Sequence, residues 1–469
     1  MRAGTIFAAL TACSIACTAT AAPKHRDLSK IKHIIVIYEE NRSFDTLYGN
    51  FPGANGLANA AATTKTQVKM DGTPFANLPD VCWKSAAPFP NTDPGTGAQK
   101  CTQEDPDFLP LEPIANGPFD ASKAVPLDQM SHEDLVHRFY QEQVQIDGGK
   151  MDKFAAVSDA GGLTMQTYDG SKLEMWKFAQ DYVLADNFFH AAFGGSFLNH
   201  QWLACACTPV YNNAPKELKA QVGTDGALIK DGIVTPDGFA VNTIFPASAP
   251  HPAEDARHPR LPLQDAPTIG DRMSDRKPKA VSWAWYSGGF NDALAGDTTT
   301  HNFQFHHQPY TYFRRYAEGE PGRAHLKDGA DFEKAIAKGT LPEVSFYKPV
   351  GDLNQHPNYA TLMDGDHKTA ELIRKIQANK KLWAGSVIIV TYDENGGTWD
   401  HVAPPVIDNW GPGTRIPAII ISPFAKRHTV DSTRYDTTSI LKLIEVRYGL
   451  SPLTSRDATA NDLTNALNL

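Results

Sequence analysis

The chain has 469 residues, of which 41% are hydrophobic and 21% are charged, and its formal net charge at pH 7 is −9. This composition is that of a globular protein of enzyme size, and it excludes a disordered chain or a fibrous repeat. The negative charge also argues against nucleic acid as a partner, because an acidic surface repels the phosphate backbone.

The first 21 residues have the features of a secretory signal peptide. A basic residue, Arg2, precedes an apolar run over 6–15, and small residues follow at Ala19-Thr20-Ala21. We expect cleavage directly after them and a periplasmic or extracellular protein. Acylation of Cys13 in a lipoprotein signal ranks second, because the apolar run before it is short. No later segment approaches the roughly 18 to 20 apolar residues of a membrane-spanning helix, so we expect no transmembrane segment. We expect residues 22–469 to form a single domain.

Two buried strands are predicted near opposite ends of the chain, and each runs directly into acidic residues. The stretch 34–38 is followed by Glu39-Glu40-Asn41, and the stretch 386–392 is followed by Asp393-Glu394-Asn395. Neither stretch alternates apolar and polar residues, as expected of strands that are buried on both faces. Further strands are predicted at 182–186 and 416–421, and helices at 369–379 and 439–448. This alternation predicts an α/β fold with a mostly parallel central sheet and helices on both faces.

Two long segments, 52–126 and 216–267, are rich in Pro, Gly, Ala and polar residues. We interpret them as long loop excursions of the same domain rather than as independent domains. They are expected to form the walls of the functional site.

Four cysteines lie beyond the predicted signal peptide, an even number that suits an oxidising compartment and two disulfides. A bond between Cys82 and Cys101 would close a local loop, whereas the spacing of Cys205 and Cys207 is tight for a direct bond. Three pairings of the four cysteines are open. A zinc site is the weaker alternative, because neither pair has a two-residue spacer.

The two acidic clusters are expected to lie together, because ligands of open α/β sheets gather beyond the carboxyl ends of the strands. Carboxylates packed so closely raise each other's pKa and protonate unless a cation neutralises them. The sequence therefore predicts one divalent metal ion, whose identity it does not reveal. An acidic pair that only begins a polar loop is the commoner case, but two pairs that each follow a buried strand favour a metal site.

Ser196 is the candidate nucleophile. It follows Phe193-Gly194-Gly195 and begins a stretch, 196–203, with helical spacing of apolar residues. The start of a helix presents free amide groups and the positive end of the helix dipole, which favour a phosphate group and a developing alkoxide. A serine here can also be only an N-cap. A metal ion beside it would lower the hydroxyl pKa and allow attack on phosphorus.

These segments resemble the bacterial acid phosphatase and phospholipase C phosphoesterase family. The resemblance rests on residues 33–45, 194–201 and 391–401, and it extends over nearly the whole chain beyond the signal peptide. It implies an alkaline-phosphatase-like fold. The acid phosphatase branch is favoured, because Asn395 stands where many phospholipase-like members have a histidine.

The resemblance also implies roles for individual residues. The implied metal ligands are Glu40, Asn41, Ser196, Asp393 and Glu394, and Ser196 is also the attacking group. The implied catalytic histidines are His307 and His356, and the implied substrate-binding histidines are His132 and His306. His137 competes with His132, because the two lie five residues apart in one segment. Glu39 and His401 are expected to support the site from outside the ligand set.

The sequence thus predicts a secreted, metal-dependent acid phosphatase that hydrolyses phosphomonoesters through a phosphoserine intermediate. Its expected substrates are small phosphorylated molecules, and phospholipid head groups are a further expected class. Histidines that must be protonated to bind phosphate predict an acidic pH optimum. A phosphodiesterase of the phospholipase C type is the alternative, and a non-catalytic phosphate-binding protein is less favoured. A sulfatase motif, Cys-x-Pro-x-Arg, is not matched, because 207–211 lacks the arginine.

Overall fold

The computed structural model describes residues 27–85, 101–224, 226–255 and 258–469. The predicted signal peptide and Cys13 therefore lie outside the described residues. Within these ranges, none of the helices has both the length and the hydropathy that a membrane crossing requires.

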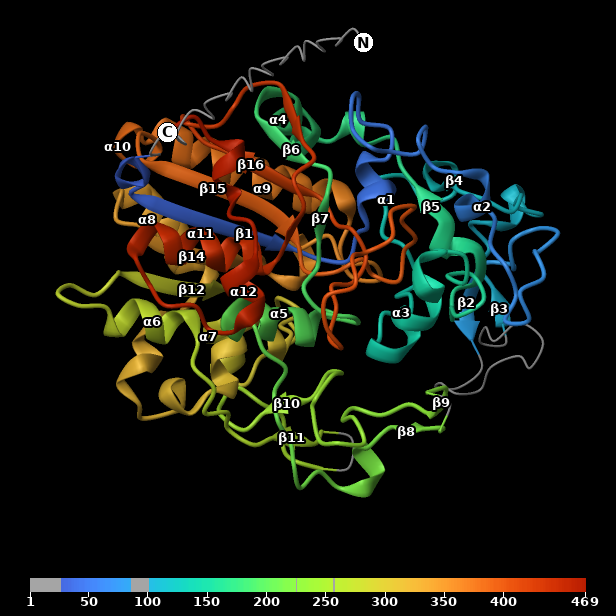
Figure 1. Cartoon of the computed structure of the whole chain (residues 1–469), viewed down its shortest axis with the longest axis horizontal. Helices are drawn as coiled ribbons and strands as arrows, with labels where there is room; N and C mark the ends of the chain where they lie inside the picture. The colour runs from blue at the N-terminus through green and yellow to red at the C-terminus, as the bar shows by residue number, and fades with distance from the viewer. Residues whose placement is uncertain (1–26, 86–100, 225, 256–257) are drawn as a thin grey trace, which may run out of the picture.

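An eight-stranded sheet forms the centre of the fold (Figure 1). In spatial order its strands are β13 (Leu326–Asp328), β12 (Trp283–Ser287), β14 (Val344–Lys348), β1 (His33–Glu39), β15 (Ser386–Tyr392), β16 (Ala418–Ile421), β6 (Val183–Ala185) and β17 (Thr429–Asp431). β16 is antiparallel to both of its neighbours, and the other described strands of this sheet all run in one direction. The prediction of an α/β fold with a mostly parallel sheet is confirmed.

Helices cover both faces of this sheet (Figure 1). One group packs around α9 and comprises α4 (Glu174–Asp181), α8 (Gly329–Lys338), α9 (Leu362–Ala378) and α10 (Lys380–Trp383). The other comprises α5 (Ser196–Cys205), α6 (Ile269–Asp275), α11 (Thr438–Tyr448) and α12 (Ser455–Thr459). The helix predicted at 369–379 begins earlier, because the Thr361 side chain caps it by accepting from the Asp364 amide.

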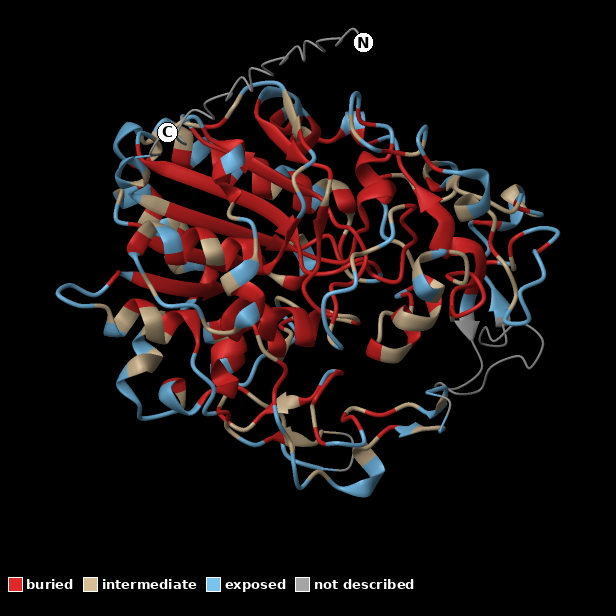
Figure 2. Cartoon of the chain, in the orientation of Figure 1, coloured by how far each residue is buried: buried red, intermediate tan, exposed pale blue. Residues whose placement is uncertain are grey.

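The strands β1 and β15 explain why the acidic clusters meet. They are adjacent and parallel, with His33 opposite Ser386 and Glu39 opposite Tyr392. All seven residues of β15 are buried, and so are six of the seven in β1. The two strands therefore end at the same edge of the sheet, inside the protein (Figure 2).

The remaining elements are short and lie mostly outside the central sheet. The helices are α1 (Phe44–Tyr48), α2 (Ala62–Lys65), α3 (Phe139–Ile146) and α7 (Phe290–Leu294). The paired strands are β2 (Cys82–Ser85) with β3 (Cys101–Glu104), β4 (Phe119–Asp120) with β5 (Gln166–Thr167), β7 (Phe188–Phe189) with β18 (Tyr435–Asp436), β8 (Gln221–Val222) with β9 (Leu228–Lys230), and β10 (Phe245–Pro246) with β11 (Arg260–Leu261). Where they are described, the excursions 52–126 and 216–267 contain such short elements and contribute no strand to the central sheet.

Cys205 and Cys207 form a disulfide, with 5.1 Å between their Cα atoms. The expectation that this spacing is tight for a direct bond is therefore wrong, and zinc ligation by this pair is excluded. The left-handed conformation of Ala206, with φ of 49°, turns the chain between the two cysteines. Cys82 is also disulfide-bonded, and the side chain of its predicted partner Cys101 lies outside the described residues.

Candidate active site

Two segments that are far apart in sequence meet at the carboxyl edge of the sheet. Glu40 and Asn41 follow β1, Asp393 and Glu394 follow β15, and all four are fully buried. The Asn41 amide donates to Asp393 Oδ1 at 3.2 Å. Arg42, the next residue, donates its amide to the Glu394 carbonyl at 3.1 Å. The predicted convergence of the two acidic clusters is therefore present in the fold.

Ser196 reaches the same point from another element. Its Oγ lies 3.5 Å from Asn41 Oδ1, and the residue is 6% exposed. Ser196 is the first residue of α5, and Gly195 occupies the N-cap position without a side-chain hydrogen bond. The Ser196 side chain therefore does not cap the helix, and its hydroxyl is free to take part in the site.

The turn before Ser196 is held by buried polar groups. The Gly194 amide donates to Glu142, which also accepts from the Thr414 amide at 2.8 Å and lies 2.9 Å from His190 Nε2. The Asn199 side chain bonds to the Gly194 carbonyl at 3.1 Å. Gly194 adopts φ of +88°, and a Cβ there would lie 2.5 Å from the Phe139 amide nitrogen. Only glycine fits this turn without displacing backbone.

Lys348 supplies positive charge to the site, and the sequence analysis did not single it out. It is the last residue of β14 and is fully buried. Its Nζ lies 2.7 Å from Glu40 Oε1 and 3.9 Å from Asp393 Oδ2. A lysine that ends a hydrophobic run, as in 344–348, is the signal that could have identified it.

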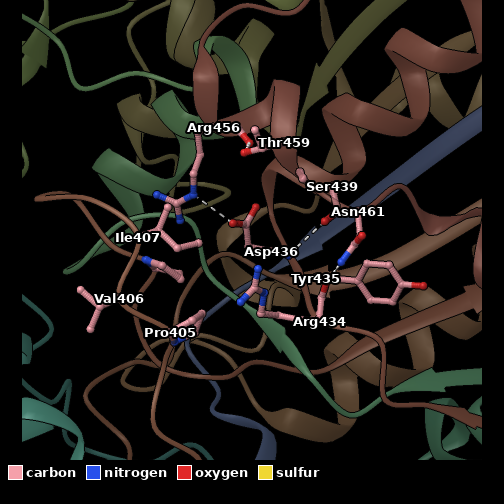
Figure 3. A pocket seen from close by; sticks show the side chains of 12 residues that line it. Pro405, Val406, Ile407, Arg434, Tyr435, Asp436, Ser439, Arg456, Thr459 and Asn461 are labelled. Carbon is pink, nitrogen blue, oxygen red and sulfur yellow. Dashed lines mark hydrogen bonds and ion pairs between the residues drawn. The ribbon is translucent and has the colours of Figure 1, made fainter.

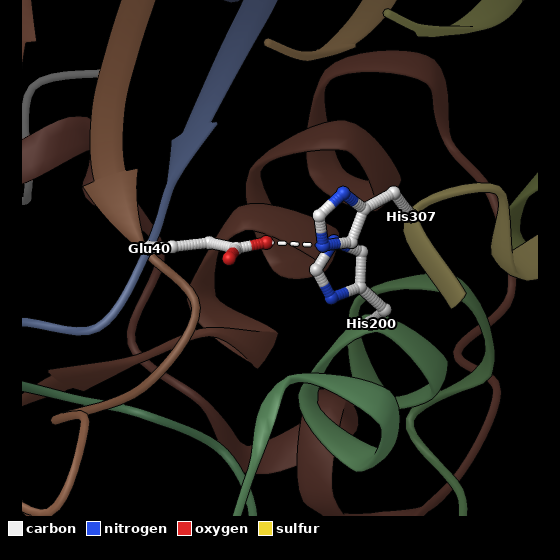
Figure 4. A group of neighbouring side chains, drawn as sticks. All are labelled: Glu40, His200 and His307. Atoms are coloured by element: carbon white, nitrogen blue, oxygen red, sulfur yellow. Dashed lines mark ion pairs between the residues drawn. The ribbon is translucent and has the colours of Figure 1, made fainter. Parts of the chain in front are cut away.

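Three histidines pack beside Glu40, and Figure 4 shows two of them, His200 and His307. His307 contacts Glu40 directly through Nε2, and the His200 ring stacks on His307 with 5.2 Å between centroids. The His306 ring lies 4.8 Å from that of His307. Burial lowers the pKa of His307 to about 4 and holds the pKa values of His200 and His306 well below 6.5. The three imidazoles are therefore neutral at pH 7 and can act as ligands or hydrogen-bond partners.

His200 was missed by the sequence analysis, although its spacing carries a signal. It lies four residues after Ser196 on α5, so the two side chains project from the same face of the helix. His200 Nδ1 lies 2.8 Å from the Ser196 carbonyl, and Nε2 has no hydrogen-bond partner among the described residues.

His137 and His356 lie on the other side of the acidic residues. His137 Nε2 is 3.8 Å from Glu394 Oε1, and His356 Nε2 is 3.8 Å from Glu40 Oε2. Burial acts to lower the pKa of His137, but the negative charges of Glu394 and Asp134 outweigh it and raise the pKa to about 9. His137 is therefore protonated at neutral pH when Glu394 is ionised.

The structure places His132 in a different environment from the histidines around Glu40. Its ring stacks on Trp83 with 4.6 Å between centroids, and its Nδ1 lies 3.8 Å from Asp105. Of the two alternatives left open by the sequence, His137 is the one that contacts the candidate active site.

Glu39 and His401 form side-chain interactions with residues outside the predicted metal-ligand set. The Glu39 side chain accepts a hydrogen bond from Thr369 on α9, away from the other three acidic side chains. His401 Nδ1 lies 2.6 Å from Asp45, in a network that also contains Arg415.

The acidic residues fit a divalent cation. Asp393 Oδ2 and Glu394 Oε1 have no hydrogen-bond partner among the described residues. Burial raises the pKa of Asp393, and burial together with the charge of Asp393 raises the pKa of Glu394 to about 8. A cation would relieve this cost of burying like charges, and the carboxylate, amide and hydroxyl oxygens are donors that Mg²⁺, Ca²⁺ or Mn²⁺ prefer.

A pocket of about 240 Å³ lies beside His137 and Gly195. Its other lining includes Asp134, Arg138 and Asp159, together with 241–243 from the second excursion. Three residues of this excursion therefore line a pocket beside His137. A different hollow, of about 310 Å³, is lined by residues such as Arg434 and Arg456 and by none of the predicted site residues (Figure 3).

Comparison with known proteins identifies the family. The model of the Phosphoesterase family matches residues 31–451. Phospholipase C A of Mycobacterium tuberculosis is 26% identical over 96% of this chain and 79% of its own length. Non-hemolytic phospholipase C of Pseudomonas aeruginosa is 21% identical over 96% of this chain and 59% of its own length. The solved structure of a protein in the alkaline phosphatase superfamily from Vibrio parahaemolyticus covers 72% of this chain and 73% of its own at 10% identity, with a TM-score of 0.35. Because the family model spans nearly the whole described chain, this protein belongs to the Phosphoesterase family and is a phosphoric ester hydrolase.

Proposed function

We propose that the protein hydrolyses phosphomonoesters through a phosphoserine formed on Ser196. The observation that carries the proposal is the position of the Ser196 hydroxyl, 3.5 Å from Asn41 Oδ1 at the start of a buried helix. One divalent cation would be held by Glu40, Asn41, Ser196, Asp393 and Glu394. When bound, it would lower the pKa of the serine hydroxyl and offset negative charge on the phosphoryl group.

In the first step, the Ser196 hydroxyl gives its proton to solvent, its Oγ attacks phosphorus, the bond from oxygen to phosphorus forms, and the bond to the leaving alcohol breaks. The amide groups at the start of α5 and the helix dipole favour the phosphate oxygens. His137 carries a proton at neutral pH when Glu394 is ionised, because the negative charges of Glu394 and Asp134 then outweigh burial and raise the pKa of His137 to about 9. It can donate a hydrogen bond to a phosphate oxygen.

The leaving alcohol takes a proton from a histidine, and His356 is the candidate, because burial lowers the pKa of His307 to about 4 and leaves it neutral at pH 7. His356 stacks on Tyr359 with 4.1 Å between ring centroids, and the Tyr359 hydroxyl donates to Glu40 at 3.0 Å. This packing fixes the orientation of the imidazole, as general acid catalysis requires. Water then attacks the phosphoserine, releasing phosphate and restoring the Ser196 hydroxyl.

The pocket beside the site favours a monoester of a small polar alcohol. Its volume is about 240 Å³, and Asp134, Arg138 and Asn242 are among its polar lining residues. The names of the relatives favour a second candidate, hydrolysis of a phospholipid diester of the phospholipase C type.

One experiment separates these substrates and tests the metal. Purified protein is assayed with a phosphomonoester, a phosphodiester and phosphatidylcholine, before and after chelation and again after a divalent metal is restored. We expect the monoester to be turned over fastest and chelation to abolish turnover. Faster turnover of phosphatidylcholine would favour the phospholipase C candidate, and turnover unaffected by chelation would contradict the metal proposal.

The phosphoserine is tested with Ser196→Ala. We expect the rate to fall by about 10³-fold or more, because the variant lacks the hydroxyl that forms the covalent intermediate. Acid quenching with a radiolabelled phosphomonoester should trap label on the parent protein and none on the variant. Ser345→Ala, which removes another buried hydroxyl in the core, should keep its activity. Full turnover by Ser196→Ala would contradict the proposal.

We also propose that the protein acts in the periplasm or outside the cell. Support comes from the disulfide between Cys205 and Cys207 and from the disulfide-bonded state of Cys82, which suit an oxidising compartment. N-terminal sequencing of the protein from its native host should find a start near Ala22.

A further inference from the structure

A second group of ligand-type side chains lies where the first excursion packs against the segment before α3. Asp105, His132 and Glu133 each present one ligand atom, and these atoms lie within 4.8 Å of one another. A fourth side chain is close, because His132 Nδ1 lies 3.6 Å from Asp107 Oδ2 and 3.8 Å from Asp105 Oδ2. The group shares no side chain with the candidate active site.

The facing atoms of this group are buried and unpaired. Asp105 is 0% exposed and Glu133 is 5% exposed. Asp105 Oδ2, Glu133 Oε1 and His132 Nδ1 have no hydrogen-bond partner in the part of the chain that the structure describes. The second oxygen of each carboxylate is already used, since Asp105 Oδ1 accepts from the Asp107 amide at 2.9 Å and Glu133 Oε2 accepts from Ser131 at 3.3 Å. The remaining atoms therefore face a shared point without a donor.

Two buried carboxylates in this arrangement require a cation or a shared proton. Burial and the neighbouring Asp105 raise the pKa of Glu133 to about 9. The His132 ring does not relieve this cost, because 3.8 Å is too long for a hydrogen bond to Asp105. Leaving a buried carboxylate oxygen without a partner is costly.

We propose that Asp105, His132 and Glu133 bind a transition-metal ion of the zinc class, with Asp107 within reach as a fourth ligand. Ligands that share a tetrahedral zinc ion at about 2.0–2.2 Å lie about 3.4 Å apart. His132 Nδ1 lies 3.6 and 3.8 Å from its two aspartate oxygens, and the ligand atoms of Asp105, His132 and Glu133 lie within 4.8 Å of one another, so movements of up to about 1.4 Å would bring them to this value. An imidazole nitrogen combined with carboxylates selects such a metal over Mg²⁺ or Ca²⁺, which prefer the all-oxygen set of the candidate active site.

A metal ion at this site would hold together two segments of the chain, the one that follows β3 and the one that precedes α3. Asp105 and Asp107 follow β3 in the first excursion, whereas His132 and Glu133 directly precede Asp134. Asp134 in turn lies 3.6 Å from His137. The metal would therefore anchor the segment that presents His137 to the candidate active site.

The proposal is tested by counting bound zinc after equilibration and gel filtration of the full-length protein. Four proteins are compared: the parent, His132→Ala, Asp393→Asn and the double variant. We expect His132→Ala to lose one equivalent of zinc in both backgrounds. The same loss is expected whether or not Asp393 also holds a metal, so this result is independent of the proposed function. Equal zinc content with and without His132→Ala would overturn the proposal.

Trp83 provides a second signal, because its indole is stacked on the His132 ring at an angle of 10°. Zinc binding should change the tryptophan emission of the parent, and Trp83→Phe should lose this change while keeping its zinc. Equal emission changes in the parent and Trp83→Phe would count against zinc at His132.

Control variants separate metal loss from misfolding and from a shared proton. Glu133→Gln keeps the size of the side chain, and with an unchanged circular dichroism spectrum it should also lose one equivalent. Full zinc binding by a folded Glu133→Gln would show that Glu133 is not a zinc ligand, and would overturn the proposal. His301→Ala, which removes a histidine 3.4 Å from Asp292, should keep its zinc content. Binding of Ca²⁺ but not Zn²⁺ at His132 would also contradict the assignment.

Discussion

Glu142 shows how a single buried side chain shapes the turn before the candidate nucleophile. It is 1% exposed and accepts hydrogen bonds from the Gly194 and Thr414 amides. Burial opposes its ionisation, but the charge of His190 outweighs burial and lowers the pKa of Glu142. Burial likewise acts against protonation of His190, whose pKa is nevertheless raised by Glu142. The two form a buried ion pair that holds the backbone in place for Ser196.

We predict that Glu142→Gln lowers the free energy of unfolding by about 3–5 kcal/mol, because it leaves a buried partner without its counter-charge. The contribution of Glu142 is present above pH 4.5 and is lost as the pH falls through its lowered pKa. That of His190 is present below pH 6.5 and is lost as the pH rises through its raised pKa. The stability difference between parent and variant should therefore be largest from pH 4.5 to 6.5.

Urea unfolding at a series of pH values measures this difference. Glu371→Gln, which removes a more exposed carboxylate paired with Lys375, should cost less than about 1 kcal/mol. A pH-independent difference for Glu142→Gln would rule out the ion pair as its cause.

At the residue scale, local patterns predict the residue types of the site better than they predict which side chains are partners. Glu40, Asp393 and Ser196 are predicted from the sequence, and they do lie together. Lys348 is not predicted, and the choice between His132 and His137 stays open in the sequence. Both outcomes have one cause: a side chain's neighbours across the fold depend on how distant segments pack, which local patterns do not encode.

The turn between β7 and α5 is the element that positions the nucleophile. Gly194 has φ of +88°, and a Cβ there would approach backbone atoms of Phe139 within 3 Å. The backbone cannot move aside as the end of a flexible side chain would. The close approach of this turn to the start of α3 therefore requires glycine for both conformation and space.

We predict that Gly194→Ala destabilises the protein more than Gly72→Ala and also lowers kcat. Gly72 has a similar φ of +85° but nothing within 4 Å of a Cβ, so it isolates the conformational cost of about 1–2 kcal/mol. The clash should add about 1–3 kcal/mol at Gly194. A displacement of Ser196 by about 1 Å would lower kcat by about 10²-fold. Thermal unfolding and steady-state kinetics of the two variants test this, and equal effects would contradict it.

At the element scale, the long periodic helices and strands were predicted well, whereas the first residue and the direction of a shorter strand were predicted less well. The strand 386–392 has its predicted bounds, and the helix predicted at 439–448 spans Thr438–Tyr448. The strand predicted at 416–421 begins only at Ala418 and runs antiparallel. Strand direction depends on the path of the chain between elements, which hydrophobic periodicity does not specify.

At the scale of the whole molecule, one buried arginine joins distant segments. Arg415 is 0% exposed and lies 3.1 Å from both Asp45 and Asp400. It also donates to the carbonyls of Asn55 and Asp186, each at 2.7 Å. These partners come from the first part, the middle and the last part of the chain, so the Arg415 side chain joins three distant segments.

We predict that Arg415→Met lowers the free energy of unfolding by about 3–5 kcal/mol, because it leaves two buried carboxylates without their counter-charge. Chemical denaturation measures the change. Arg314→Met removes an exposed arginine that pairs with Asp265 at 2.7 Å and should leave the unfolding midpoint unchanged. Equal midpoints for the parent and Arg415→Met would contradict the prediction.

The sequence by itself determined the α/β class, the strands that end in acidic residues, the Gly-Gly-Ser turn and the family. These features are encoded locally, in β-branched runs, helical spacing and motifs that can be recognised without knowing their neighbours. The tertiary structure alone decided that Lys348 and His200 join Glu40, that His137 faces the site, and that His132 sits with Asp105. Such contacts join residues up to hundreds of positions apart, and they arise only when the sheet and helices pack into one arrangement.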